Sequence, residues 1–178
     1  PSVGWAPREP IRGSFLEGAS REGCLAAMNV SVYSYIAMAK RMVPLMAGHK
    51  ASLLTLSYLG GEKVVPNYNT MGLCKAALES ATRYIAADVG PQGIRANTLS
   101  CGPIKTLAAS GIKGFSPMLA QCKAVSPSRS LVSIDEVGNT AAFLLSDNSL
   151  GITAETIYID GGFNALACCV DQAASENA

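Results

Sequence analysis

Residues 53–79 contain an apolar run, a glycine-bearing loop and a helical pattern in direct succession. The run at 53–56 ends at Ser57 and Tyr58, which is typical of a buried parallel strand that delivers polar groups at its carboxyl end. Open α/β sheets bind ligands at that edge. The segment therefore predicts a strand-loop-helix unit of an α/β fold, with a site where the strand ends.

The helical pattern begins near Tyr68 and runs to about Gly90. Lys75 follows Tyr68 by seven residues, which at about 100° per residue puts both side chains on one helix face. A nearby ammonium group favours phenolate and lowers the pKa of a phenol, so Tyr68 is a candidate acid with Lys75 as its electrostatic support. A Tyr and a Lys at this spacing also occur together by chance, without any chemistry.

Composition limits the classes of function. The chain has 178 residues, 49% of them hydrophobic and 15% charged, which predicts one buried core in one domain. A formal net charge of +1, with no run of basic residues, argues against a nucleic-acid partner. Polar residues interrupt every apolar stretch well before about 18 residues, so we expect no membrane insertion, and no secretion signal is recognisable.

Cysteine and histidine offer no metal site. The six cysteines are scattered without metal-type spacing, so we expect reduced thiols and a cytoplasmic protein; they are Cys24, Cys74, Cys101, Cys122, Cys168 and Cys169. The only histidine, His49, falls in an expected turn between a helix and a strand. A Ser-His-Asp hydrolase or a histidine-based metal site would depend on this one poorly placed residue.

Several motifs together resemble one family. Six residues separate Tyr68 from Lys75, and nine separate Tyr58 from Tyr68. This pattern resembles the signature of the enoyl-acyl-carrier-protein reductases, a branch of the short-chain dehydrogenase/reductase superfamily whose other members place three residues between Tyr and Lys. The resemblance runs from residue 1 to about residue 165 and includes the segments 2–7, 54–60, 66–69, 102–113 and 160–163.

The resemblance implies a Rossmann-like, doubly wound parallel sheet. Residues 1–165 would be the C-terminal part of a single reductase domain, and 166–178 a disordered tail. The family's N-terminal strands, with the glycine-rich turn that binds pyrophosphate, are expected to be missing, because no G-x-G-x-x-G follows a strand in this sequence.

The resemblance also implies an NADH-dependent reduction of an enoyl thioester carried on acyl carrier protein. Tyr68 would hold the enolate oxygen, Lys75 the nicotinamide ribose hydroxyls, and Tyr58 would assist near the thioester. Further cofactor contacts would come from Val3, Gly4, Ile104, Lys105, Thr106, Leu107 and Ala108, and a substrate contact from Ala6. Residues 111–121 resemble a mobile substrate-binding segment.

Four further elements are expected along the chain. They are an amphipathic helix over 21–46 with Ser20 as N-cap, strands over 93–100 and 156–160, and a helix after the capping-box pattern Ser133–Glu136. By resemblance, the helix over 21–46 and the one near Tyr68 would pack between subunits of a homotetramer. Two alternatives stay open: a carbonyl reductase of the wider superfamily, and a catalytically incomplete fragment that only associates with other subunits.

Overall fold

Three parallel strands form the centre of the molecule. The computed structural model describes residues 3–7, 13–104 and 115–166. The strands β1 (Ser52–Ser57), β2 (Arg95–Cys101) and β3 (Thr156–Ile159) pair in the order β1-β2-β3. Ser57 lies opposite Ser100, and Cys101 lies opposite Ile159, so the carboxyl ends of all three strands meet at one edge. The predicted strands are confirmed, with ends shifted by one or two residues.

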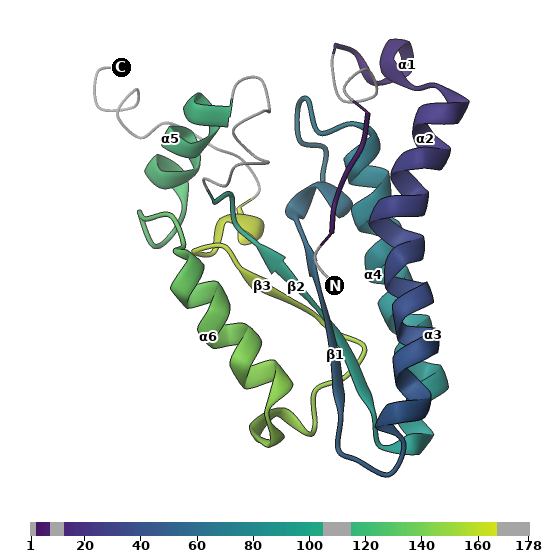
Figure 1. The fold of residues 1–178 in the computed structure, drawn as a ribbon. Coiled ribbons are helices and arrows are strands. Elements are labelled where there is room, and N and C mark those ends of the chain that lie inside the picture. Colours follow the sequence, from purple (N-terminus) through teal and green to yellow (C-terminus); the bar gives the residue numbers. More distant parts are fainter. Residues whose placement is uncertain (1–2, 8–12, 105–114, 167–178) are drawn as a thin grey trace.

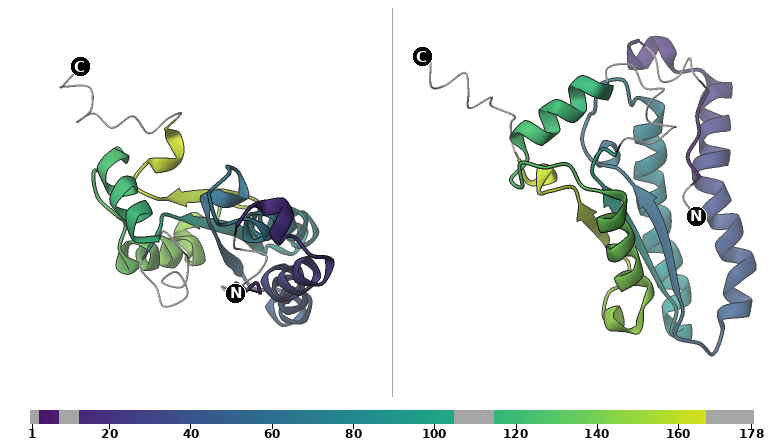
Figure 2. Two further views of the ribbon diagram at one scale, coloured as in Figure 1. Left: turned by 90° about the horizontal axis from the view of Figure 1, so that it is seen from above. Right: turned by 60° about the vertical axis from the view of Figure 1, so that its left-hand side comes forward.

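Helices cover both faces of this sheet (Figure 1). The helices α2 (Arg21–Met28), α3 (Ser34–Met46) and α4 (Thr70–Val89) lie on one side, and α6 (Ile134–Leu145) lies on the other. The view from above in Figure 2 shows the same layers. Parallel strands need such crossovers, which α4 supplies between β1 and β2, and α6 between β2 and β3. The expected doubly wound arrangement is therefore confirmed.

Two further helices lie toward the end of the molecule where the strands end (Figure 1). They are α1 (Phe15–Gly18) and α5 (Phe115–Val125). The second contains residues 115–121 of the expected substrate-binding segment, while 111–114 lie outside the described residues. Also outside them are the predicted cofactor residues Lys105, Thr106, Leu107 and Ala108, and the predicted tail except Leu166.

The predicted helix over 21–46 is present but is not uniform. The hydroxyl of Ser20 accepts a hydrogen bond from the Gly23 amide at 3.0 Å, as expected for an N-cap. Between α2 and α3, residues Asn29–Tyr33 form a π-helical turn. The apolar pattern did not predict this turn, because the helical spacing is kept on either side of it. His49 is exposed in the turn after α3, as predicted.

The start of α4 differs from the prediction. The helix begins at Thr70, two residues after Tyr68. Asn67 and Asn69 have positive φ angles of 63° and 43°, which Asn tolerates better than most residues and which an α-helix excludes. Tyr68 therefore lies in a turn ahead of the helix, and the argument that placed it and Lys75 on one helix face was wrong.

Strand β2 and helix α6 are joined through a buried arginine. Arg95 is 5% exposed, and its guanidinium donates hydrogen bonds to the carbonyls of Leu144 and Ser146, each at 3.0 Å. These carbonyls belong to the end of α6, where a cation interacts favourably with the helix dipole. The capping box of Ser133 and Glu136 at the other end of α6 is confirmed.

Within the described ranges, no helix is long and apolar enough to cross a membrane. In the same part of the chain, no group of three or more His, Cys, Asp or Glu side chains could hold a metal ion.

Candidate functional site

Two tyrosines meet at the carboxyl end of β1. Tyr58 directly follows the strand, and its ring packs edge-to-face against Tyr68, with ring centroids 5.0 Å apart and an interplanar angle of 70°. The structure thus brings together the two tyrosines that the sequence singled out. The contact joins the end of the strand to the turn before α4.

Two glycines allow this approach. A Cβ atom on Gly60 would collide with the ring of Tyr68, so the absence of a side chain lets the ring lie over the 3₁₀ turn Leu59–Gly61. A Cβ atom on Gly72 would lie 2.7 Å from the carbonyl oxygen of Gly60, which is closer than real Cβ contacts come. The turn and the first part of α4 therefore pack backbone against backbone.

The side chain of Lys75 reaches the carboxyl end of β1. Its ammonium group donates a hydrogen bond to the carbonyl of Leu56 at 2.9 Å. Burial lowers the pKa of Lys75, while the neighbouring Cys101, Cys74 and Glu79 act in the opposite direction. This hydrogen bond fixes the ammonium at the sheet edge.

The predicted effect of Lys75 on Tyr68 is not found. The pKa of Tyr68 is raised, first by burial and then by Tyr58 and Cys74. Burial also raises the pKa of Tyr58, to about 12, with a smaller contribution from Cys122. The expectation of a lowered Tyr68 pKa was therefore wrong, because desolvation outweighs any effect of the ammonium group. Both phenols stay protonated at neutral pH and can act as hydrogen-bond donors.

The segment 3–7 passes close to Lys75. A Cβ atom on Gly4 would lie 3.9 Å from the Lys75 Nζ atom and 3.6 Å from the Met71 Cε atom. Ala6 packs against the buried cluster of Ala27, Val32 and Cys74. The exposed Val3 precedes them. The structure thus places the N-terminal candidates at the same edge as the tyrosines.

Strand β2 contributes the rest of this edge. Ile104 is partly buried and follows the carboxyl end of β2. Burial raises the pKa of the Cys101 thiol to about 11, and Lys75 opposes this. Cys101 therefore remains a neutral thiol at this edge. Cys24, Cys74, Cys101 and Cys122 are all free of disulfides.

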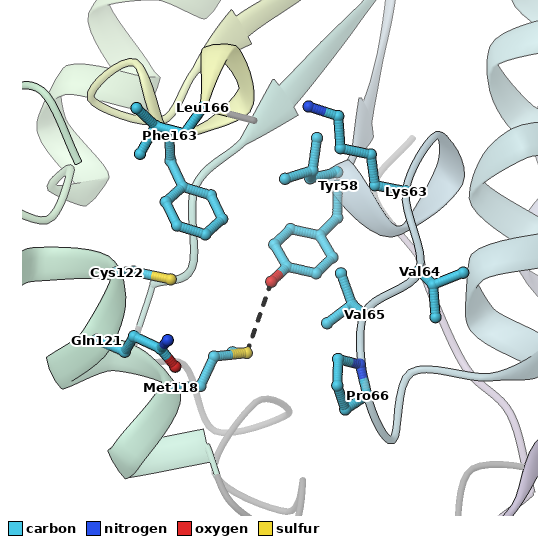
Figure 3. A pocket seen from close by; sticks show the side chains of 11 residues that line it. Tyr58, Lys63, Val64, Val65, Pro66, Met118, Gln121, Cys122, Phe163 and Leu166 are labelled. Carbon is cyan, nitrogen blue, oxygen red and sulfur yellow. Dashed lines mark hydrogen bonds between the residues drawn. The ribbon is translucent and has the colours of Figure 1, made fainter. Parts of the chain in front are cut away.

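A cavity of about 240 Å³ lies beside Tyr58 (Figure 3). The phenol donates a hydrogen bond to the sulfur of Met118 in α5, at 3.7 Å. Apolar side chains dominate the lining, which comprises Tyr58, Leu59, Lys63, Val64, Val65, Pro66, Met118, Gln121, Cys122, Phe163 and Leu166. Tyr58 is therefore shared between the tyrosine pair and an apolar cavity.

Sequence reasoning missed several residues of this site. Glu79 accepts a hydrogen bond from the hydroxyl of Ser57, and Glu62 accepts one from the hydroxyl of Tyr158. Met118 lies in the expected substrate-binding segment 111–121, but nothing in the sequence indicated its contact with Tyr58. These pairs join positions that are 22 to 96 residues apart, and no local spacing signals them.

Comparisons with known proteins point to one family. The family model described as "Enoyl-(Acyl carrier protein) reductase" matches residues 1–164. The enoyl-[acyl-carrier-protein] reductase [NADH] FabI of Salmonella typhimurium is 52% identical over 166 residues, which are 93% of this chain and 63% of that protein. The protein of the same name from Bacillus subtilis is 45% identical over 165 residues, with the same coverage. The chain thus spans about 63% of the length of these relatives.

Solved structures give the same result. The crystal structure of the enoyl-[acyl-carrier-protein] reductase (NADH) from Aquifex aeolicus superimposes with a TM-score of 0.90 at 45% identity, covering 94% of this chain and 65% of that one. The reductase from Anaplasma phagocytophilum, solved in complex with NAD, gives a TM-score of 0.88 at 42% identity, covering 95% of this chain and 64% of the other. The chain therefore belongs to the enoyl-(acyl carrier protein) reductase family.

Proposed function

We propose that the chain takes part in the NADH-dependent reduction of the trans-2 double bond of an enoyl thioester on acyl carrier protein, in fatty acid biosynthesis. One observation carries the proposal: Tyr58, Tyr68 and Lys75 lie together at the carboxyl end of β1. The relatives from Salmonella typhimurium and Bacillus subtilis are named for this activity.

The residues present fit a nicotinamide cofactor. An ammonium group has three N–H donors, and the hydrogen bond of Lys75 to Leu56 uses one of them, so others can bind ribose hydroxyls. The backbone at Gly4 passes close to this ammonium group, so both can contact one bound cofactor. Further contacts are proposed for Val3, Ile104 and residues 105–108. When bound, NADH supplies the hydride for the β-carbon of the substrate.

Tyr68 stabilises the charge that forms on the substrate. As the thioester carbonyl becomes an enolate, its oxygen gains negative charge, and a hydrogen bond from Tyr68 becomes stronger. The raised pKa keeps the phenol protonated and able to donate. Tyr68 therefore acts as a neutral hydrogen-bond donor, and not as the acid with a lowered pKa that the sequence predicted.

Tyr58 and Ala6 are proposed to contact the substrate. The apolar cavity beside Tyr58 is a suitable place for part of an acyl chain, because its lining buries apolar surface and excludes water from the thioester. The partner that presents the substrate would be acyl carrier protein. We further propose a homotetramer that works in the cytoplasm.

The test follows NADH oxidation by absorbance with a crotonyl thioester, in this chain and in a fusion to the N-terminal part of the Salmonella relative. Tyr68→Phe is expected to lower kcat by roughly 10²- to 10³-fold with the KM for NADH retained, since it removes a donor to the oxyanion. Lys75→Ala is expected to raise the Kd for NADH.

Lys50→Ala, at an exposed position between α3 and β1, serves as the control. Unchanged turnover in Tyr68→Phe would remove the phenol from the mechanism. Reduction of a simple carbonyl substrate in place of the enoyl thioester would favour the wider superfamily's chemistry. If neither this chain nor the fusion turned over the substrate, the remaining interpretation would be a chain that only associates with other subunits.

A further inference from the structure

Ser31 makes an unusual contact with the backbone of Trp5. Ser31 lies in the π-helical turn between α2 and α3 and is 3% exposed. Its hydroxyl donates a hydrogen bond to the carbonyl of Trp5 and accepts one from the Trp5 amide, both at 2.9 Å. One hydroxyl thus pairs both backbone groups of a residue 26 positions away.

The π-helical turn explains why this serine reaches another segment. Ser34, three residues later, uses its hydroxyl in the ordinary way and donates to the Val30 carbonyl of its own helix at 2.6 Å. The wider turn at Asn29–Tyr33 interrupts the regular α-helical hydrogen bonds, and such turns are frequent at functional sites. The hydroxyl of Ser31 faces the segment 3–7 instead.

The contact fixes residues on both sides of Trp5. Gly4 lies beside Lys75 and Met71, and Ala6 packs against the core cluster that contains Ala27. The Ser31 hydroxyl is also 4.0 Å from the sulfur of Met71. The Ser31 hydroxyl therefore ties the segment 3–7 to the π-helical turn, and Gly4 of that segment lies beside Met71 and Lys75 of α4.

We propose that Ser31 is a positioning residue that holds the segment 3–7 over Lys75 and so preorganises the cofactor site. The inference rests on the proposed function, which assigns Val3 and Gly4 to NADH. A segment that is already ordered loses less conformational entropy when the cofactor binds. Ser31 itself lies behind the segment and acts through Trp5.

Trp5 is the only tryptophan in the chain, so its fluorescence reports directly on this segment. Ser31→Ala removes both hydrogen bonds. We expect the anisotropy of Trp5 to fall and its quenching by acrylamide to increase. The Kd for NADH should rise about tenfold, as the loss of two hydrogen bonds implies. In turnover assays the KM for NADH should change more than kcat.

Ser34→Ala is the matched control, because it removes a hydroxyl from the same helix whose bond stays within that helix. It should leave the anisotropy and the Kd for NADH unchanged. Ser31→Cys nearly keeps the side-chain volume but forms only weak hydrogen bonds, so it should behave like Ser31→Ala and replaces it if the alanine variant does not fold.

Equal Trp5 anisotropy and equal Kd for NADH in wild type and both Ser31 variants would overturn the proposal. The same changes in Ser34→Ala would overturn it as well. If neither the wild-type chain nor the fusion binds NADH, the proposed function is contradicted. If the Trp5 anisotropy still falls in the Ser31 variants and not in Ser34→Ala, the positioning of the segment is supported independently.

Discussion

Tyr58 connects three parts of the site through one side chain. Its ring packs on Tyr68, its hydroxyl contacts Met118, and its face lines the apolar cavity. All three contacts favour the neutral phenol, because they remove it from water without supplying a cation. Burial accordingly raises the pKa of Tyr58 from 10.0 to about 12.

This pKa predicts how stability depends on pH. An unfolded chain releases the Tyr58 proton near pH 10 and the folded chain near pH 12. The contribution of Tyr58 is therefore fully present below pH 10 and declines as the pH rises from 10 to about 12. Tyr58→Phe should make the fall in the free energy of unfolding shallower in this range, by at most about 1.4 kcal/mol per pH unit.

Denaturant titrations between pH 8 and pH 11 measure this slope. Val64→Ala is the control, because Val64 is 97% exposed and carries no titratable group. Parallel curves for wild type and Tyr58→Phe would show that burial does not protect this phenol.

At the scale of the elements, the 3₁₀ turn Leu59–Gly61 and helix α4 fit only because Gly72 has no side chain. Gly72→Ala would place a Cβ atom 2.7 Å from the Gly60 carbonyl oxygen, so the turn and the Tyr68 ring above it must move. We expect a loss of about 1–3 kcal/mol in the free energy of unfolding. The shifted phenol should also lower kcat in the NADH oxidation assay.

Gly138→Ala provides a matched control. Gly138 lies inside α6, and a Cβ atom there meets nothing within 4 Å. Alanine should stabilise that helix by about 0.5–1 kcal/mol and leave kcat unchanged. If Gly72→Ala behaved like Gly138→Ala, the close packing of turn and helix would not matter.

These elements also show what sequence could and could not predict. The strand at 52–57 and α6 follow from an apolar run and a capping box, which are local signals. The start of α4 depends on positive φ angles at Asn67 and Asn69, which an apolar pattern does not reveal. The Ser31–Trp5 contact depends on a π-helical turn, and the cavity on α5 meeting the loop after β1. The Ser31–Trp5 contact and the cavity form only when segments that are distant in the sequence pack together.

For the molecule as a whole, helices α3 and α4 leave a large amount of apolar surface exposed. They lie side by side (Figure 1), and Leu45 on α3 is 73% exposed while Tyr84 on α4 is 75% exposed. Leu25, Tyr33, Ile36, Met42 and Leu73 on the same group of helices are exposed as well. Exposed apolar surface of this extent marks interaction sites. The proposed homotetramer would cover it with the same helices of another subunit.

Sedimentation velocity tests this proposal at several concentrations. The chain should sediment as a species larger than its 18.4 kDa monomer, and Leu45→Lys or Tyr84→Lys should shift it toward the monomer, because each places a charge in an apolar interface. Val64→Lys is the control: Val64 is 97% exposed, but it lies in the loop between β1 and α4 and not on the helices themselves. It should leave the sedimentation unchanged. A wild-type chain that stays monomeric throughout would exclude association through α3 and α4, and a control that dissociates equally would place the interface elsewhere.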